Sequence, residues 1–156
     1  MSEEAPSIEI TALLCDSAAA VGGKLYILGA GWSRVITEGR PLTMALAIHL
    51  GVPWHDANHP LELRIDLVDA DRKIVMGANN QPMVRVEGRM EVGRPPGLKP
   101  GTVLDSSFAV PIEGLTLAPG FYQWDVSITD SSSGQRVTKS LRFEVVQGPA
   151  GVPLQS

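Results

Sequence analysis

The chain has 156 residues, which suits one domain with a core of its own. Its 13 Lys and Arg side chains are outnumbered by 17 Asp and Glu, and the net charge is −4. The sequence contains no cluster of basic residues, so nucleic-acid binding is not expected. No apolar run reaches about 18 residues, so we expect no membrane-spanning helix.

Two further features favour a cytoplasmic protein. The acidic and polar residues 1–7 differ from a signal peptide, which needs a basic start followed by an apolar stretch. The single cysteine, Cys15, cannot form an internal disulfide, so an oxidising compartment is not indicated. Cys15 stands in an apolar run, where we expect an inert core thiol.

Apolar and polar side chains alternate along most of the chain, as is typical of strands with one buried face. Residues 61–67 are the clearest example, with aliphatic side chains separated by Glu62, Arg64 and Asp66. Similar patterns predict strands over residues 8–14, 24–28, 42–50, 74–76, 84–91, 104–110, 122–129 and 137–145.

Glycines interrupt one of these strands. Residues 32–36 are predicted to continue the strand 24–28 past Gly29 and Gly31. Glycine within a strand indicates a bulge or a close approach of two backbones, so we expect one of these here.

Two other segments carry local expectations. Residues 15–21 are expected to hold one helical turn, capped by Asp16 or Ser17. On the strand 42–50, Ala45 and Ala47 share the face opposite the large aliphatic side chains. Small residues on that face predict that another part of the chain packs closely against it.

Eight or nine strands with at most one or two helical turns predict an all-β fold, an antiparallel two-sheet β-sandwich that is immunoglobulin-like or related. We expect this sandwich to span residues 8–147. Residues 1–7 are predicted to be a flexible N-terminus. Residues 148–156, rich in Pro, Gly and small polar side chains, are predicted to be a disordered tail.

One hairpin carries an architectural resemblance. Residues 117–124 (LAPGFYQW) resemble a strand opening of immunoglobulin-like sandwiches, and the similarity extends over 117–145. In those sandwiches a Tyr two residues before a core position hydrogen-bonds back to the preceding corner. The resemblance implies that Tyr122 makes this corner and that Trp124 enters the core, and it implies no function.

The chain also resembles a family of small uncharacterised bacterial β-sandwich proteins, a domain of unknown function. The resemblance implies a cytoplasmic domain and transfers no catalytic residue. It rests on the stretches 13–16 (LLCD), 23–32 (GKLYILGAGW) and 52–69 (VPWHDANHPLELRIDLVD).

Three histidines, His49, His55 and His59, raise the hypothesis of a metal-dependent enzyme, because zinc binds three or four N, S or carboxylate ligands that converge on the ion. His55 and His59 stand in a turn beside Asp56, where polar residues are expected without a metal. His49 lies on a predicted strand, and Cys15 is distant in the sequence. We therefore expect a solvated turn, with no metal and no other cofactor.

Catalytic motifs are incomplete. Gly31-Trp32-Ser33 starts like the nucleophile elbow of a hydrolase, but Val35 stands where the second glycine is required. We therefore expect a protein that is not an enzyme, and we name no catalytic residue.

The remaining candidates for function form a predicted interaction surface of Trp32, Trp54, His55, Asp56 and His59. The tryptophans either close the ends of the sandwich or, if exposed, anchor a partner. We expect a non-catalytic interaction or structural module that binds a protein partner or associates with itself, because edge strands are templates for pairing. The alternative is a carbohydrate- or small-ligand-binding domain that uses the same residues.

Overall fold

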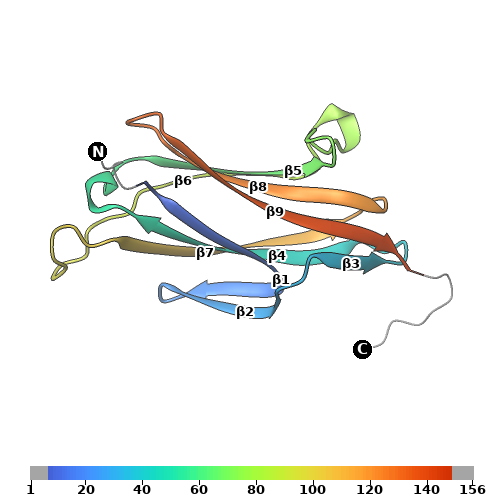
Figure 1. The fold of residues 1–156 in the computed structure, drawn as a ribbon, viewed down its shortest axis with the longest axis horizontal. Helices are drawn as coiled ribbons and strands as arrows, with labels where there is room; N and C mark the ends of the chain where they lie inside the picture. Colours follow the sequence, from blue (N-terminus) through green and yellow to red (C-terminus); the bar gives the residue numbers. More distant parts are fainter. Residues whose placement is uncertain (1–6, 149–156) are drawn as a thin grey trace, which may run out of the picture.

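The computed structural model describes residues 7–148, so the expected N-terminus and tail lie almost entirely outside the described residues. Nine strands form two sheets, and two single-turn 3-10 helices interrupt the connections (Figure 1). The elements are β1 (Glu9–Val21), β2 (Lys24–Ala30), β3 (Arg34–Thr37), β4 (Leu42–Val52), η1 (Trp54–Asp56), β5 (Leu61–Asp69), η2 (Ala78–Asn80), β6 (Arg85–Met90), β7 (Leu104–Leu115), β8 (Gly120–Asp130) and β9 (Arg136–Gln147).

The two sheets form the layers of a sandwich, which confirms the predicted fold class. The four-stranded sheet has the order β2-β1-β4-β7, and the five-stranded sheet has the order β3-β9-β8-β5-β6. Neighbouring strands are antiparallel except β3 and β9, which are parallel. Alternate side chains of both sheets meet in one apolar core, as do Leu46 and Ile48 of β4 and Ile65 of β5. In the described part of the chain, no helix is long and apolar enough to cross a membrane.

The helical turn expected at residues 15–21 is wrong, because β1 continues through Val21 as a strand. The second half of β1 pairs with β2, with Ser17 opposite Leu28 and Ala19 opposite Tyr26. A ladder of backbone hydrogen bonds along the hairpin outweighs the helix preference of three consecutive alanines, since propensity is a weak local bias.

Residues 32–36 do not continue β2, which corrects another prediction. The backbone at Gly31 has a φ of +94°, and after it the chain crosses to the other sheet. There Val35 in β3 pairs with Val145 of β9 and packs against the core. Packing of Val35 against the core and its pairing with β9 stabilise this arrangement, and the local alternation of side chains does not reveal them.

The strand predicted at residues 74–76 does not form either. Arg72 and Asn79 adopt left-handed backbone conformations and interrupt the pairing on both sides of it. What remains is two isolated bridges, Val68 with Ile74 and Met76 with Pro82.

The β1–β2 hairpin folds back over the outer face of the four-stranded sheet. Leu25 and Ile27 of β2 pack against the buried Cys15, Ala45 and Ala47, which form a second, smaller core. The close packing predicted from the small residues of β4 is thereby confirmed. Burial, followed by the neighbouring carboxylate charge at position 16, raises the pKa of the Cys15 thiol, and its Sγ donates to the Ala45 carbonyl at 3.3 Å. A buried thiol with a raised pKa has little thiolate and is inert.

The corner implied by the immunoglobulin resemblance is present. The Tyr122 hydroxyl donates to the Ala118 carbonyl at 2.7 Å, and Trp124 is fully buried. The Phe143 ring stacks between them, with its centroid 5.8 Å from that of Tyr122 and 6.2 Å from that of Trp124. This stack joins β8 to β9 in the centre of the five-stranded sheet.

Gly29 has a close neighbour, but this is the Asp16 side chain and not a second backbone, so the predicted approach of two backbones is wrong. Its φ is +66°, a conformation that favours glycine, and a Cβ built there would collide with the Asp16 carboxylate. The hairpin therefore needs glycine at this position for two separate reasons.

We expect Gly29→Ala to destabilise the fold more than Gly22→Ala. Gly22 has a similar φ of +59° but faces open space, so the two variants share a backbone cost of about 1–2 kcal/mol and differ in the collision with Asp16. Urea unfolding measures both costs. Adding Asp16→Ala to Gly29→Ala should recover most of the difference, and equal costs for the two glycine variants would contradict the close approach.

Candidate functional site

The residues predicted to form one interaction surface lie at two places. Trp32 stands beside β3, where the neighbouring Ser33 carbonyl accepts from the backbone N–H of Glu144 near the end of β9. Trp54 and the residues that follow it lie near the β8–β9 turn, where β9 begins. Because β9 is 12 residues long, the two tryptophans are at opposite ends of the sandwich.

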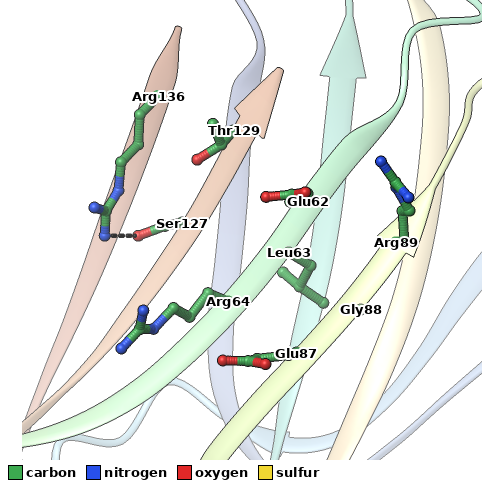
Figure 2. A pocket seen from close by; sticks show the side chains of 9 residues that line it. All are labelled: Glu62, Leu63, Arg64, Glu87, Gly88, Arg89, Ser127, Thr129 and Arg136. Atoms are coloured by element: carbon green, nitrogen blue, oxygen red, sulfur yellow. Dashed lines mark hydrogen bonds between the residues drawn. The ribbon is translucent and has the colours of Figure 1, made fainter. Parts of the chain in front are cut away.

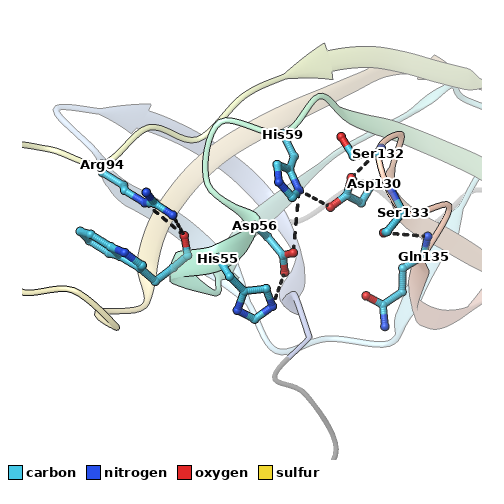
Figure 3. Close-up of polar contacts among 9 residues, drawn as sticks. His55, Asp56, His59, Arg94, Asp130, Ser132, Ser133 and Gln135 are labelled. Carbon is cyan, nitrogen blue, oxygen red and sulfur yellow. Dashed lines mark hydrogen bonds and ion pairs between the residues drawn. The ribbon is translucent and has the colours of Figure 1, made fainter.

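Both tryptophans are half-buried and pack against the main core. The Trp32 indole N–H donates to the Gly29 carbonyl at 2.9 Å. Arg94 lies over the Trp54 ring, with its guanidinium carbon 4.6 Å from the ring centroid, and its Nη2 donates to the Trp54 carbonyl at 2.6 Å (Figure 3). One face of Trp54 is thus already covered by a cation.

A cluster of imidazoles and carboxylates lies beside Trp54. The Nδ1 of His59 donates to Oδ2 of Asp130 at 2.9 Å and lies 3.9 Å from Oδ1 of Asp56 (Figure 3). The Nε2 of His55, which is more than half exposed, lies 3.5 Å from Oδ2 of Asp56. We call Asp56, His59 and Asp130 the end cluster.

Strand register brings the end cluster together. Leu61 of β5 is paired with Asp130 of β8, so His59, two residues earlier, arrives beside the Asp130 carboxylate. The backbone N–H of Ser131 then donates to the Pro60 carbonyl at 3.0 Å and ties the two connections. Asp130 lies 71 residues from His59 in the sequence, directly after the predicted strand 122–129. Pairing of the strands that precede and follow these turns was the signal that could have linked them.

Asp130 is 3% exposed, and its charge is held by several donors. Burial acts to raise the pKa of its carboxyl, but the hydrogen bond and charge of His59 and the backbone N–H groups of Ser132 and Ser133 together keep that pKa below its ordinary value. These two N–H groups lie 2.8 Å and 3.4 Å from Oδ1. The carboxylate therefore caps the β8–β9 turn and is ionised at neutral pH.

Asp56 is held differently. Its side chain is only 12% exposed, yet within residues 7–148 its carboxylate accepts no hydrogen bond. Its neighbours are the two imidazoles of His55 and His59, at 3.5 Å and 3.9 Å. Among the described residues, Trp124 Nε1 is the one fully buried side-chain polar atom without a hydrogen-bond partner, so the Asp56 carboxylate is held by its two imidazole neighbours and is not an orphaned buried group.

The three histidines do not converge. His49 lies on the outer face of β4 and pairs with the exposed Asp105 at 2.9 Å, away from the end cluster. The ligand atoms that do converge are those of Asp56, His59 and Asp130, which all lie within 4.8 Å of one another. Within the described range, no Ser or Cys side chain hydrogen-bonds to a histidine.

The outer face of the five-stranded sheet has a shallow hollow of about 540 Å³ (Figure 2). Opposite charges face each other across its strands, with Glu62 opposite Arg89 and Glu87 opposite Arg64. Such cross-strand pairs stabilise a solvated sheet face. Because the charges of the hollow nearly cancel, it gives little preference for a charged ligand.

Apolar side chains are exposed on the β1–β2 hairpin. Tyr26 is 58% exposed and Leu28 is 72% exposed, both on the face of β2 that points away from the sheet, and Val21 at the end of β1 is 62% exposed. We call these three residues the hairpin patch. It was missed in the sequence because Tyr26 and Leu28 alternate with Leu25 and Ile27, so both faces of the strand are apolar.

The sequence matches a family model over most of its length. Residues 10–139 match a family of unknown function, DUF6941. The chain belongs to this family. Its membership agrees with the predicted resemblance to an uncharacterised β-sandwich domain, and no match was found among the curated proteins.

Solved structures resemble this DUF6941 chain in outline. The soluble domain of PmoD from Methylocystis sp. is 16% identical, covers 87% of this chain and 90% of its own, and has a TM-score of 0.34. A target of the Northeast Structural Genomics Consortium is 14% identical, covers 96% of this chain and 93% of its own, and also has a TM-score of 0.34. At such scores these likenesses carry no inference about this chain.

We expect Asp130→Asn to lower the free energy of unfolding at pH 7 by about 1.5–3 kcal/mol, the usual value of a hydrogen bond to a charged group. The matched control is Asp105→Asn, because the His49–Asp105 pair has the same 2.9 Å distance but an exposed carboxylate. Its cost should stay below about 1 kcal/mol. Urea unfolding in chelator-containing buffer measures both.

The cost of Asp130→Asn should also depend on pH. The pKa of Asp130 is lower in the folded state than in the unfolded state, so its contribution is present above the unfolded value, near pH 4. It is lost as the pH falls through the folded value, so wild type and variant should converge in acid. A difference that is constant down to that range would contradict the assigned ionisation.

Proposed function

We propose that this protein is a non-catalytic interaction module that associates with a second copy of itself through the free edge of β2. The observation that supports this is the hairpin patch, in which Tyr26 and Leu28 are exposed beside a strand edge that pairs with no other strand among residues 7–148. An exposed apolar edge strand is a ready template for strand pairing.

The other three sheet edges carry features that discourage pairing. β3 has four residues, so it offers only a short edge to another strand. β6 alternates charged side chains at Arg85, Glu87 and Arg89. β7 contains Pro111, which has no N–H to donate. β2 has neither a proline nor a charge between Leu25 and Ala30, so it is the edge that pairing with another strand fits best.

Antiparallel pairing of two β2 strands is self-complementary. If Ile27 faces Ile27 of the second copy, Tyr26 lies opposite Leu28 of that copy, and each aromatic ring covers an aliphatic side chain. In the same register Lys24 lies opposite Ala30 of the second copy, so like charges do not meet. A two-fold arrangement of this kind uses the same patch on both copies and closes at a dimer.

Two other aspects of the proposal follow from residues already described. Carbohydrate binding at Trp32 and Trp54 is the weaker alternative, because the indoles are at opposite ends of the sandwich and Arg94 covers Trp54. We place the module in the cytoplasm, where the unpaired thiol of Cys15 stays reduced.

We expect Tyr26→Lys to weaken dimerisation at least roughly tenfold, because two buried apolar contacts are replaced by two like charges near the two-fold axis. Sedimentation velocity over a range of protein concentrations measures the dimer dissociation constant. The matched control is Phe121→Lys, since Phe121 is another exposed aromatic strand residue, 64% exposed on β8.

A monomeric wild type at high micromolar concentration would overturn self-association. Equal weakening by Tyr26→Lys and Phe121→Lys would overturn the assignment to β2. Circular dichroism of both variants confirms that each is folded before the comparison is made.

A further inference from the structure

We propose that the end cluster binds one divalent first-row transition ion, of which zinc is the probe, with Asp56, His59 and Asp130 as ligands. This site does not involve β2, and it is independent of self-association. It revises the expectation of a solvated turn, because Asp130 completes a ligand set that the nearby histidines alone do not provide.

The ligand atoms are close to the geometry that an ion requires. Zinc binds imidazole nitrogen and carboxylate oxygen at about 2.0–2.2 Å, so neighbouring ligand atoms around it lie roughly 3–3.5 Å apart. The His59–Asp130 distance is already 2.9 Å and the His59–Asp56 distance is 3.9 Å. All three atoms fall within 4.8 Å of one another, so side-chain rotation of Asp56 toward the other two closes the site.

Charge in the end cluster favours a dication. Two carboxylates approach one imidazole, and within residues 7–148 the ion pairs of Asp56 and Asp130 involve histidines and no Lys or Arg. With His59 neutral the ligands carry two negative charges, which one divalent ion balances. Arg94, the cation beside this end, is engaged with the ring and carbonyl of Trp54 (Figure 3).

Asp56 contributes a second carboxylate whose charged neighbours are imidazoles at long range. Its carboxylate is largely buried and accepts no hydrogen bond within the described range, whereas Asp130 is satisfied by backbone donors. An ion would replace these two long imidazole contacts with a direct bond to the carboxylate. His55, whose Nε2 lies 3.5 Å from the second Asp56 oxygen, is not among the three groups whose ligand atoms converge.

The donor set selects the class of ion. Calcium and magnesium prefer oxygen ligands alone, whereas imidazole together with carboxylates suits zinc and its first-row neighbours. Binding replaces the hydrogen bond from His59 to Asp130: the Nδ1 proton leaves to solvent, Nε2 carries the one proton of the neutral imidazole, and the Nδ1 lone pair binds the ion. Oδ1 of Asp130 keeps its backbone donor from Ser132. The ion would then connect η1 to the β8–β9 turn and hold this end of the sandwich closed.

Titration of zinc chloride into the chelator-treated full chain, followed by calorimetry, tests the site. We expect one ion per chain, and Asp56→Asn should weaken binding at least roughly tenfold, since it removes one charged ligand. Asp56→Asn is the informative variant because its carboxylate makes no hydrogen bond whose loss would unfold the turn. The matched control is His49→Gln, which removes an imidazole from the distant His49–Asp105 pair and should leave zinc binding unchanged.

A second readout is thermal stability. Zinc should raise the melting temperature of wild type and His49→Gln but not that of Asp56→Asn, because an ion that binds the folded state stabilises it by mass action. The proposal is overturned if millimolar zinc shows no stoichiometric binding. It is equally overturned if Asp56→Asn binds zinc as tightly as wild type, which would assign the ion to surface histidines.

Discussion

The pairing of β8 with β5 on one side and with β9 on the other determines the position of the central core residues and of the end cluster. Trp124 anchors this arrangement, since it is fully buried and stacks against Phe143 of β9 while β8 pairs with β5. Once Trp124 enters the core, alternation fixes the register along β8, because a shift of one residue would turn every core side chain outward. Asp130 then has one possible position, at the end of β8 beside the turn that carries His59.

Burial gives two similar His–Asp pairs different roles. His59–Asp130 and His49–Asp105 have the same 2.9 Å separation, but the Asp130 side chain is 3% exposed and the Asp105 side chain is 73% exposed. The exposed His49–Asp105 pair adds little to the free energy of unfolding, because solvent screens its charges and both side chains lose conformational freedom. The His59–Asp130 pair lies in a low-dielectric setting, and backbone donors also hold the Asp130 carboxylate. Its charge therefore contributes to stability and is available to the proposed ion.

The β1–β2 hairpin combines a structural role with a candidate binding role. One face of β2 covers the small residues of β4 and buries Cys15, which the four-stranded sheet could not shield by itself. The opposite face is equally apolar and has no cover in the described chain. Gly29 lets this hairpin accommodate the Asp16 side chain, because a Cβ at Gly29 would collide with that carboxylate. One face of β2 therefore covers the second core, and the opposite face exposes Tyr26 and Leu28.

The sequence by itself determined the class of fold, the strands of the core and the corner at Tyr122, because period-two alternation and a glycine- and proline-rich turn pattern are local properties. It also located the turn that carries Asp56 and His59. Only the tertiary structure decided that residues 15–21 stay extended, that Val35 joins the other sheet and that Asp130 lies beside His59. These outcomes depend on pairing between strands far apart in the chain, whose gain in hydrogen bonds and buried area no local pattern records.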